Sequence, residues 1–204
     1  MNLKLEDILT KVSSLYNRYG IRSITMDDVA KELCISKKTL YQHVTDKEDL
    51  VEKVMMYEVS ARRPLKNGNS KRNAIEDLFV VHSMINQIIR ETNPSKEYDL
   101  RKYYPEINKR IHDLKKEKTM KSMLYNIRKG KKEGLFREDL DEEIISKMYL
   151  LRMSQIPLDE SENVEEYTSS NFIYEMFIYH IRGLATQKGI DFLEQNVDKL
   201  KLKN

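Results

Sequence analysis

The sequence has few of the residues that interrupt helices and almost none that staple small domains. It has 6 glycines and 4 prolines in 204 residues, which disfavours sandwiches, barrels and collagen-like repeats. A single cysteine, Cys34, excludes an internal disulfide framework and a cysteine-rich metal cluster. No stretch approaches the roughly 18 apolar residues of a membrane span, and no basic segment followed by an apolar one marks a signal peptide. We therefore expect a soluble, reduced, cytoplasmic protein.

Patterns that carry catalysis are missing as well. The sequence contains no His-Glu-x-x-His, no phosphate-binding glycine loop and no Gly-x-Ser-x-Gly elbow. His82, His112 and His180 are scattered without the spacing of metal ligands. The sequence therefore predicts no enzyme, no cofactor and no metal site.

Charge is abundant and arranged in blocks. Residues 101–134 hold 12 basic and 4 acidic residues, and residues 138–166 hold 2 basic and 10 acidic ones. Such blocks are usually solvated helix faces. The basic block by itself favours a nucleic-acid site in the middle of the chain, but the motif below indicates a different place.

Helical periodicity and start signals divide the chain into helices. A stripe of apolar residues from Leu5 to Tyr19 predicts a helix that ends at Gly20. Thr25 with Asp28, Ser36 with Thr39, and the run 45–48 resemble helix caps. Beyond a linker near 62–70, further helices are expected near 71–91, 95–103, 105–130, 141–158, 167–187 and 189–202. No strand alternation is convincing, so we expect an all-α chain of about nine to ten helices.

Segment 25–50 predicts a helix-turn-helix, in which two short helices are joined by a tight turn. Ala30 is small enough for the second helix to pack closely across the first, and Ile35 fills the angle between them. The second helix buries Leu40 and Val44 and exposes the polar residues between them. A glutamine at position 42 has the amide geometry to read a base edge in the major groove.

At these residues the sequence resembles the TetR family of bacterial transcription regulators. The family pattern is met at Thr25, Val29, Ala30, Ser36, Thr39, Leu40, Tyr41, His43, Lys47 and Leu50. It departs at Leu33, Cys34, Ile35 and Val44, where Cys34 replaces the turn glycine. A left-handed backbone at Cys34 would cost about 1–2 kcal/mol, because a side chain disfavours that conformation.

The resemblance implies a three-helix DNA-binding domain over residues 1–48 and a helical ligand-binding and dimerisation domain over residues 49–204. It implies a DNA-binding set that consists of Thr25, Ser36, Lys37, Lys38, Thr39, Tyr41, Gln42, His43 and Lys47. In this set, residues 37, 38, 39 and 42 face the major groove, residues 41 and 43 bind phosphates, and residues 25 and 47 hold the backbone on either side. For Tyr41 and His43, packing within the helix-turn-helix core is the alternative.

The C-terminal half is rich in methionine and aromatic residues, which are usually core at helical spacing. In relatives the same helices enclose a small-molecule pocket, for which the candidates here are Phe79, Met84, Tyr103, Tyr104, Met120 and Met123. Two apolar stripes suggest a dimer interface, because a twofold dimer is the commonest soluble oligomer. Its predicted residues are Ile145, Met148, Phe172, Met176, Phe177 and Leu184.

Together these features predict a TetR-like repressor that binds a palindromic double-stranded DNA operator as a homodimer. An unidentified small-molecule effector would control it, and no membrane would be involved. One alternative is a DNA-organising protein that responds to no inducer. An alternative of another class is a helical enzyme or carrier with a vestigial helix-turn-helix.

Overall fold

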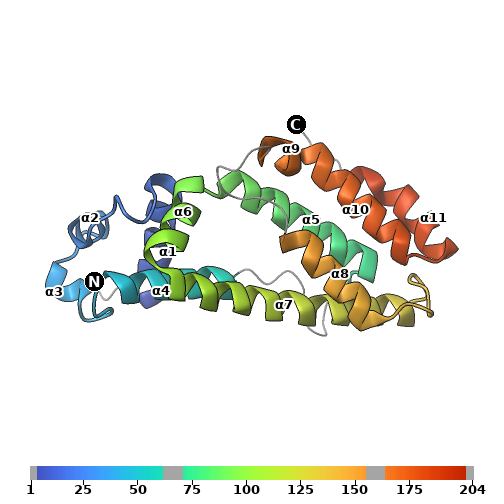
Figure 1. Ribbon diagram of the computed structural model, residues 1–204, viewed down its shortest axis with the longest axis horizontal. Coiled ribbons are helices and arrows are strands. Elements are labelled where there is room, and N and C mark those ends of the chain that lie inside the picture. The colour runs from blue at the N-terminus through green and yellow to red at the C-terminus, as the bar shows by residue number, and fades with distance from the viewer. Residues whose placement is uncertain (1–3, 62–70, 155–163, 201–204) are drawn as a thin grey trace. The chain divides into compact units, whose positions relative to one another are not determined.

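The protein is helical throughout the part that the computed structural model describes, which is residues 4–61, 71–154 and 164–200 (Figure 1). Those residues form eleven α-helices and one 3-10 turn. They include no strand, but an isolated antiparallel bridge joins Phe136 to Ala185. The all-α fold predicted from the sequence is therefore confirmed.

The chain divides into two compact units, Met1–Arg63 with Glu91–Lys115, and Pro64–Arg90 with Lys116–Asn204. The first unit contains α1 (Leu5–Tyr19), α2 (Met26–Glu32), α3 (Lys37–Leu40), α4 (Lys47–Ala61), α6 (Pro94–Tyr103) and the start of α7 (Pro105–Lys132). The second contains α5 (Ala74–Glu91) up to Arg90, the rest of α7, α8 (Glu142–Ser154), α9 (Val164–Thr168), α10 (Ser170–Leu184), α11 (Gln187–Asn196) and the turn Val197–Lys199. The functional boundary after residue 48 stays a prediction.

Helix ends in the N-terminal region follow the expected capping residues, with one correction. Gly20 ends α1 with a left-handed φ of 80°, and the Thr25 hydroxyl oxygen accepts from the Asp28 amide at 3.2 Å. In the run 45–48 the sequence places the cap of the fourth helix at Thr45, whereas in the structure Asp46 is the cap and the helix begins at Lys47. The Asp46 carboxylate accepts from the Asp49 amide at 2.8 Å, and the Thr45 amide donates to the Asp49 carboxylate.

Side-chain caps also set the later helices. The side-chain oxygen Oδ1 of Asn73 accepts from the amides of Ile75 and Glu76, so α5 begins at residue 74 instead of 71. Ser169 and Thr186 cap α10 and α11 in the same way. The helix predicted over 167–187 is therefore shorter at both ends and spans Ser170–Leu184. α8 is described as far as Ser154, and its predicted end near 158 lies outside the described residues.

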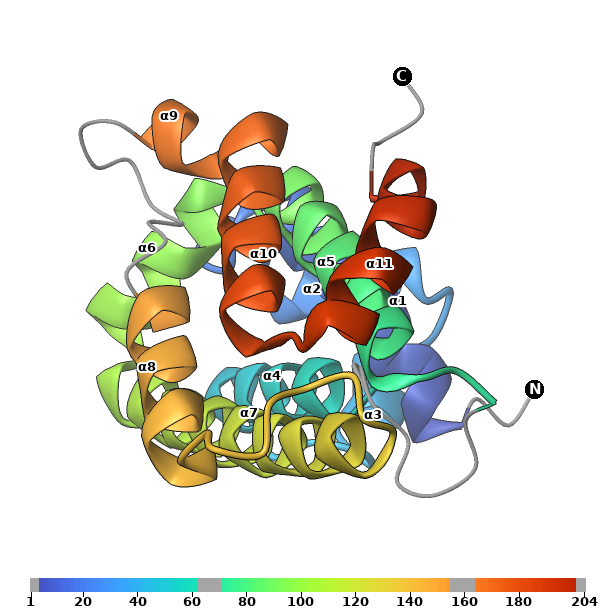
Figure 2. The same ribbon diagram turned by 90° about the vertical axis from the view of Figure 1, so that its right-hand side faces the viewer.

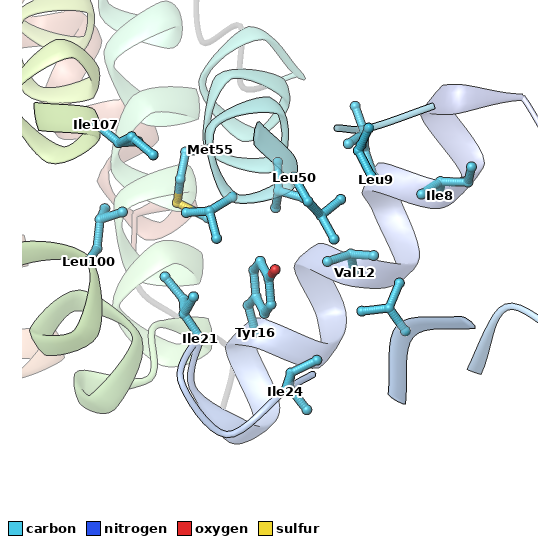
Figure 3. Close-up of a cluster of buried hydrophobic side chains, with 14 of the residues drawn as sticks. Ile8, Leu9, Val12, Tyr16, Ile21, Ile24, Leu50, Met55, Leu100 and Ile107 are labelled. Atoms are coloured by element: carbon cyan, nitrogen blue, oxygen red, sulfur yellow. The ribbon is translucent and has the colours of Figure 1, made fainter. Parts of the chain in front are cut away.

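The core of the first unit is built on the apolar stripe of α1. Ile8, Val12 and Tyr16 are fully buried in one core with Leu50 of α4 and Leu100 of α6 (Figure 3). Burying such aliphatic side chains contributes about 1.5–3 kcal/mol each. The buried residues of the helix-turn-helix belong to this same core, which therefore supports α2 and α3.

A buried lysine ties α6 to this core. Lys96 is only 3% exposed, and its ammonium donates to both Glu58 carboxylate oxygens at 2.7 and 2.8 Å and to Asn17 at 2.8 Å. Asp99, one turn along α6, accepts from the Arg22 amide at 2.8 Å in the turn after α1. The contacts of α6 are therefore polar as well as apolar.

The second unit has its own core around Phe136, which is fully buried in the segment after α7. The Phe136 ring lies so close to Gly130 that an added Cβ would come within 2.0 Å of it. Backbone bonds from Arg137 to Leu184 and from Thr186 to Leu135, both 2.9 Å, hold this segment against the end of α10.

Candidate functional site

The helix-turn-helix is formed by α2 and α3 of the first unit. The Ile35 amide donates to the Ala30 carbonyl at 3.0 Å across the turn, and the Ser36 hydroxyl accepts from the Thr39 amide at 3.0 Å to start α3. Cys34 has a φ of 55°, so the turn keeps its left-handed backbone without a glycine. The Cys34 conformation therefore carries the strain expected from the sequence.

The outward side of α3 is polar and exposed. Lys37, Lys38, Tyr41 and Gln42 are all exposed, and the Tyr41 side chain is 47% exposed. Tyr41 is therefore not part of the core. The helix is shorter than its apolar pattern suggests, because it ends at Leu40 and Gln42 lies in the following turn, where its amide donates to the Thr39 carbonyl.

Lys37 has an acidic neighbour that the sequence reasoning missed. Its ammonium lies 2.6 Å from the Asp27 carboxylate of α2, and both side chains are at least half exposed. The hydrogen bond to Asp27 raises the pKa of Lys37. Asp27 therefore neutralises one of the two lysines that open α3 and competes with any anion that approaches it.

The other predicted DNA-binding residues flank this surface, and several already have partners. Thr25 is exposed, but its hydroxyl is bound to the Asp28 carboxylate at 2.6 Å. Lys47 donates to the Arg22 carbonyl at 3.2 Å, and burial lowers its pKa. Thr39 and His43 are partly buried, with the Thr39 hydroxyl 2.8 Å from that of Ser36.

The comparison with known families identifies the domain around this motif. Residues 8–54 match the family described as "Bacterial regulatory proteins, tetR family". Residues 8–54 are therefore a TetR-type N-terminal domain. The match spans α1 to the middle of α4, which are the helices that build and support the helix-turn-helix. No curated protein matches the sequence.

Several solved structures share the fold at low sequence identity, and the first two below are described as TetR-family proteins. The chain resembles a regulator from Cytophaga hutchinsonii (18% identity, 92% of this chain and 100% of that one, TM-score 0.62). It also resembles CprB from Streptomyces coelicolor in complex with its operator (15%, 95% and 94%, TM-score 0.62). NemR of E. coli in its reduced form is similar as well (12%, 89% and 97%, TM-score 0.67).

The residues predicted for an effector pocket are not gathered in one place within either unit. Tyr103 and Tyr104 belong to the first unit, where the Tyr103 hydroxyl accepts from Arg22 and Tyr104 packs on the core. In the second unit Phe79 and Met123 are buried in its core, and Met120 is half-buried. Phe79 and Met84 also line a shallow surface depression along α5. Several of these Met, Tyr and Phe residues therefore belong to the separate cores of the two units.

Half of the predicted dimer interface is corrected by burial within the chain. Met176, Phe177 and Leu184 of α10 are at most 8% exposed and pack inside the second unit, so they have no free surface for a partner. Phe172 and Met148 are exposed, and Ile145 is half-buried. The wide apolar circumference of α10 is explained by its central position among α5, α8 and α11 (Figure 2).

Buried polar side chains form a cluster in the second unit that the sequence reasoning missed. We define the polar cluster as two groups that pack on α10, which are His82 with Asn86 of α5, and Tyr149 with Arg152 of α8 and His180 of α10. His82 contacts the Phe177 ring edge-on with 5.0 Å between centroids, and the His180 ring lies 5.0 Å from that of Tyr149. Asn86 lies 3.1 Å from a nitrogen of the His82 ring.

Burial keeps both histidines of the polar cluster neutral. It lowers the pKa of His82 to about 4, and burial together with the nearby Arg152 charge lowers the pKa of His180 to about 3. Within the described ranges no group of three or more His, Cys, Asp or Glu side chains is placed to hold a metal. The signal available in the sequence was the pair His82 and Asn86, four residues apart within an apolar stripe.

No helix in the described part of the chain has both the length and the apolar content needed to cross a membrane.

Proposed function

We propose that the protein is a ligand-responsive transcriptional repressor in the cytoplasm that binds a palindromic DNA operator as a homodimer and has no enzymatic activity. The observation that carries this proposal is the exposed surface of α3 and the turn after it, where Lys37, Lys38, Tyr41 and Gln42 face away from the core. The match of residues 8–54 to the tetR regulators supports it.

Base reading is assigned to Gln42 and phosphate binding to Tyr41. An exposed glutamine forms two hydrogen bonds to adenine in the major groove, a contact worth about 1–3 kcal/mol against the wrong base. A phosphate contact sets affinity and register but carries no sequence information. The two neighbouring side chains are therefore expected to respond differently to substitution.

Selection from a random pool of DNA duplexes tests this assignment. We expect the wild-type protein to select a palindrome, Gln42→Ala to lose preference at one symmetric pair of positions, and Tyr41→Phe to keep the sequence while binding about 1 kcal/mol more weakly. Tyr19, exposed on α1, gives the matched control Tyr19→Phe. Recovery of no palindrome, or of an unchanged motif with Gln42→Ala, would contradict the assignment.

The basic residues of α7 outnumber Lys37 and Lys38 of α3, so they are the alternative source of positive charge for DNA binding. Replacing Lys38 by Ala should weaken binding to every sequence and reduce the salt dependence by about one unit of slope. Neutralising Lys115, Lys116 and Lys118 together should change little. A larger loss from the triple variant in a salt titration would place the DNA surface on α7.

The dimer is proposed to form through exposed apolar side chains of α8 and α10. Ile144, Met148 and Leu151 follow one another at four- and three-residue steps on α8 and are 54–66% exposed. Phe172 and Tyr179 are exposed on α10. A second copy of the chain is the natural cover for these residues, because a twofold interface uses the same patch on both subunits.

Replacing Met148 by Asp should produce monomers, because the new carboxylate would be buried without a partner. Since Met148 is 61% exposed in one chain, its fold should not change. Met56→Asp on α4, another exposed methionine, is the control that should remain dimeric. Sedimentation analysis distinguishes the two, and an unchanged Met148→Asp dimer would move the interface elsewhere.

An effector acts in this proposal by favouring the dimer conformation that does not fit the operator, which requires different affinities for the two conformations. A DNA-organising protein would bind without a palindrome and without an effector, so the same selection distinguishes it.

A further inference from the structure

We propose that the polar cluster of the second unit binds an organic anion with an apolar body, held by Arg152 and His180. The cluster lies among α5, α8 and α10, the helices labelled in Figure 2. This inference deepens the proposed function, because it names the class of effector and the residues that contact it.

Two polar atoms of the cluster are buried without a hydrogen-bond partner in the described part of the chain. They are Nε2 of His180, whose residue is 9% exposed, and Nε of the half-buried Arg152. A buried polar group without a partner costs about 1–3 kcal/mol. Most buried groups in proteins have partners, so two orphans in one cluster indicate a missing acceptor.

The charge of the cluster selects an anion. None of the described carboxylates forms an ion pair with Arg152, whose Cζ lies 5.8 Å from the centroid of the Tyr149 ring. The His180 ring is neutral and carries one proton, which placed on Nε2 makes that atom a donor. A carboxylate or sulfonate would accept from both side chains, whereas a water molecule would leave the Arg152 charge uncompensated.

The surroundings of the cluster select an apolar body. Ile173 and Phe177 of α10 are buried beside it, and Ile85 of α5 and Met153 of α8 pack against them. Met153 directly follows Arg152 on α8, so a cationic group and an apolar wall lie in adjacent positions. An anion attached to a hydrocarbon or aromatic body would satisfy both parts.

Fluorescence titration of the full-length protein without DNA tests the inference with two probes. Anilinonaphthalene sulfonate is an anion with an aromatic body, and phenylnaphthylamine has the same body without the sulfonate. The chain contains no tryptophan, so the probe signal is clean. We expect Arg152→Met to weaken sulfonate binding by about tenfold, the usual worth of a charge-assisted contact, and to leave phenylnaphthylamine binding unchanged.

Arg182→Met is the matched control, because Arg182 is an exposed arginine of α10 that pairs with Glu194. It should not change the binding of either probe. His180→Phe keeps an aromatic side chain but removes both ring nitrogens, and it should weaken sulfonate binding about threefold. This variant decides the question if Arg152→Met does not fold. Equal sulfonate binding by wild type and both cluster variants, or a parallel loss of both probes, would overturn the inference.

The outcome is separable from that of the proposed function. Anion binding is measured without DNA, and operator selection is measured without the probe. A chain that selects a palindrome but shows no sulfonate preference would lose only the anion site.

Discussion

Two buried polar groups, one in each unit, differ in how their nitrogens are paired. In the first unit the Lys96 ammonium has hydrogen bonds to Glu58 and Asn17. In the second unit Arg152 and His180 leave buried nitrogens unpaired. A buried charge is tolerated when it is paired, and an unpaired one must have its pKa shifted or find a ligand. The difference separates a structural ion pair from a candidate binding site.

Breaking the ion pair of the first unit should give the largest effect. Replacing Lys96 by Met removes the ammonium and leaves the Glu58 carboxylate, only 14% exposed, without its cation. We expect the free energy of unfolding to fall by about 3–5 kcal/mol. Urea denaturation measures the loss.

The double variant Lys96→Met with Glu58→Met is the control for this prediction. It removes both charges, so it should recover a large part of the stability lost in the single variant. If the double variant is no more stable than the single one, Lys96 contributes through packing of its stem instead of through charge.

The buried neutral His180 of the second unit should make stability depend on pH. The pKa of His180 is about 3 in the folded chain and about 6.5 when unfolded. The unfolded state therefore binds more protons as pH falls below about 6.5, and the folded state is destabilised. Between pH 6.5 and 5 we expect a loss of about 2 kcal/mol from this residue.

Chemical denaturation at several pH values measures this slope, and His180→Gln should reduce it by the share of His180, while His82, with a pKa of about 4, keeps contributing. His112→Gln is the control, because His112 is exposed on α7 and should leave the slope unchanged. An unchanged slope in His180→Gln would mean that His180 is accessible to protons in the folded chain, which would contradict its assignment to the buried cluster.

On the surface of the first unit, Asp27 offers a test of the exposed ion pair with Lys37. Asp27→Asn removes a carboxylate from the proposed DNA surface and frees Lys37, so DNA affinity should rise by about 1 kcal/mol with a steeper salt dependence. Glu32→Gln, another exposed carboxylate of α2, changes the charge equally and should have a smaller effect. Equal gains would assign the effect to net charge.

The backbone of the first unit is strained at Cys34. Relieving this strain should give the smallest change in the free energy of unfolding. Cys34→Gly should stabilise the chain by about 1 kcal/mol, because glycine adopts the φ of 55° without steric cost. Thermal unfolding under reducing conditions measures it. A lower melting temperature would mean that the gain in unfolded-state entropy outweighs the relief of strain.

Local sequence patterns were sufficient for most of the helix-turn-helix region. The apolar stripe of α1 and the Thr25 and Ser36 caps were predicted, because each depends on residues within four positions along the chain. The left-handed backbone at Cys34 was an expectation that followed from the glycine at this place in the TetR pattern. The cap of α4 was wrong by one residue, since Thr45 and Asp46 both carry suitable oxygens and only the packed turn selects Asp46.

Tertiary structure decided what the sequence left open in the second unit. The apolar stripe of α10 did not reveal that Phe177 faces its own core while Tyr179 is exposed, because periodicity distinguishes apolar faces but does not identify what covers them. Likewise His82 and His180 are almost a hundred positions apart in the sequence, and only the packing of α5 on α10 places the His82 ring against Phe177, three residues before His180. The fold class and the DNA-binding motif are local properties of the sequence, whereas the buried cluster depends on contacts between distant helices.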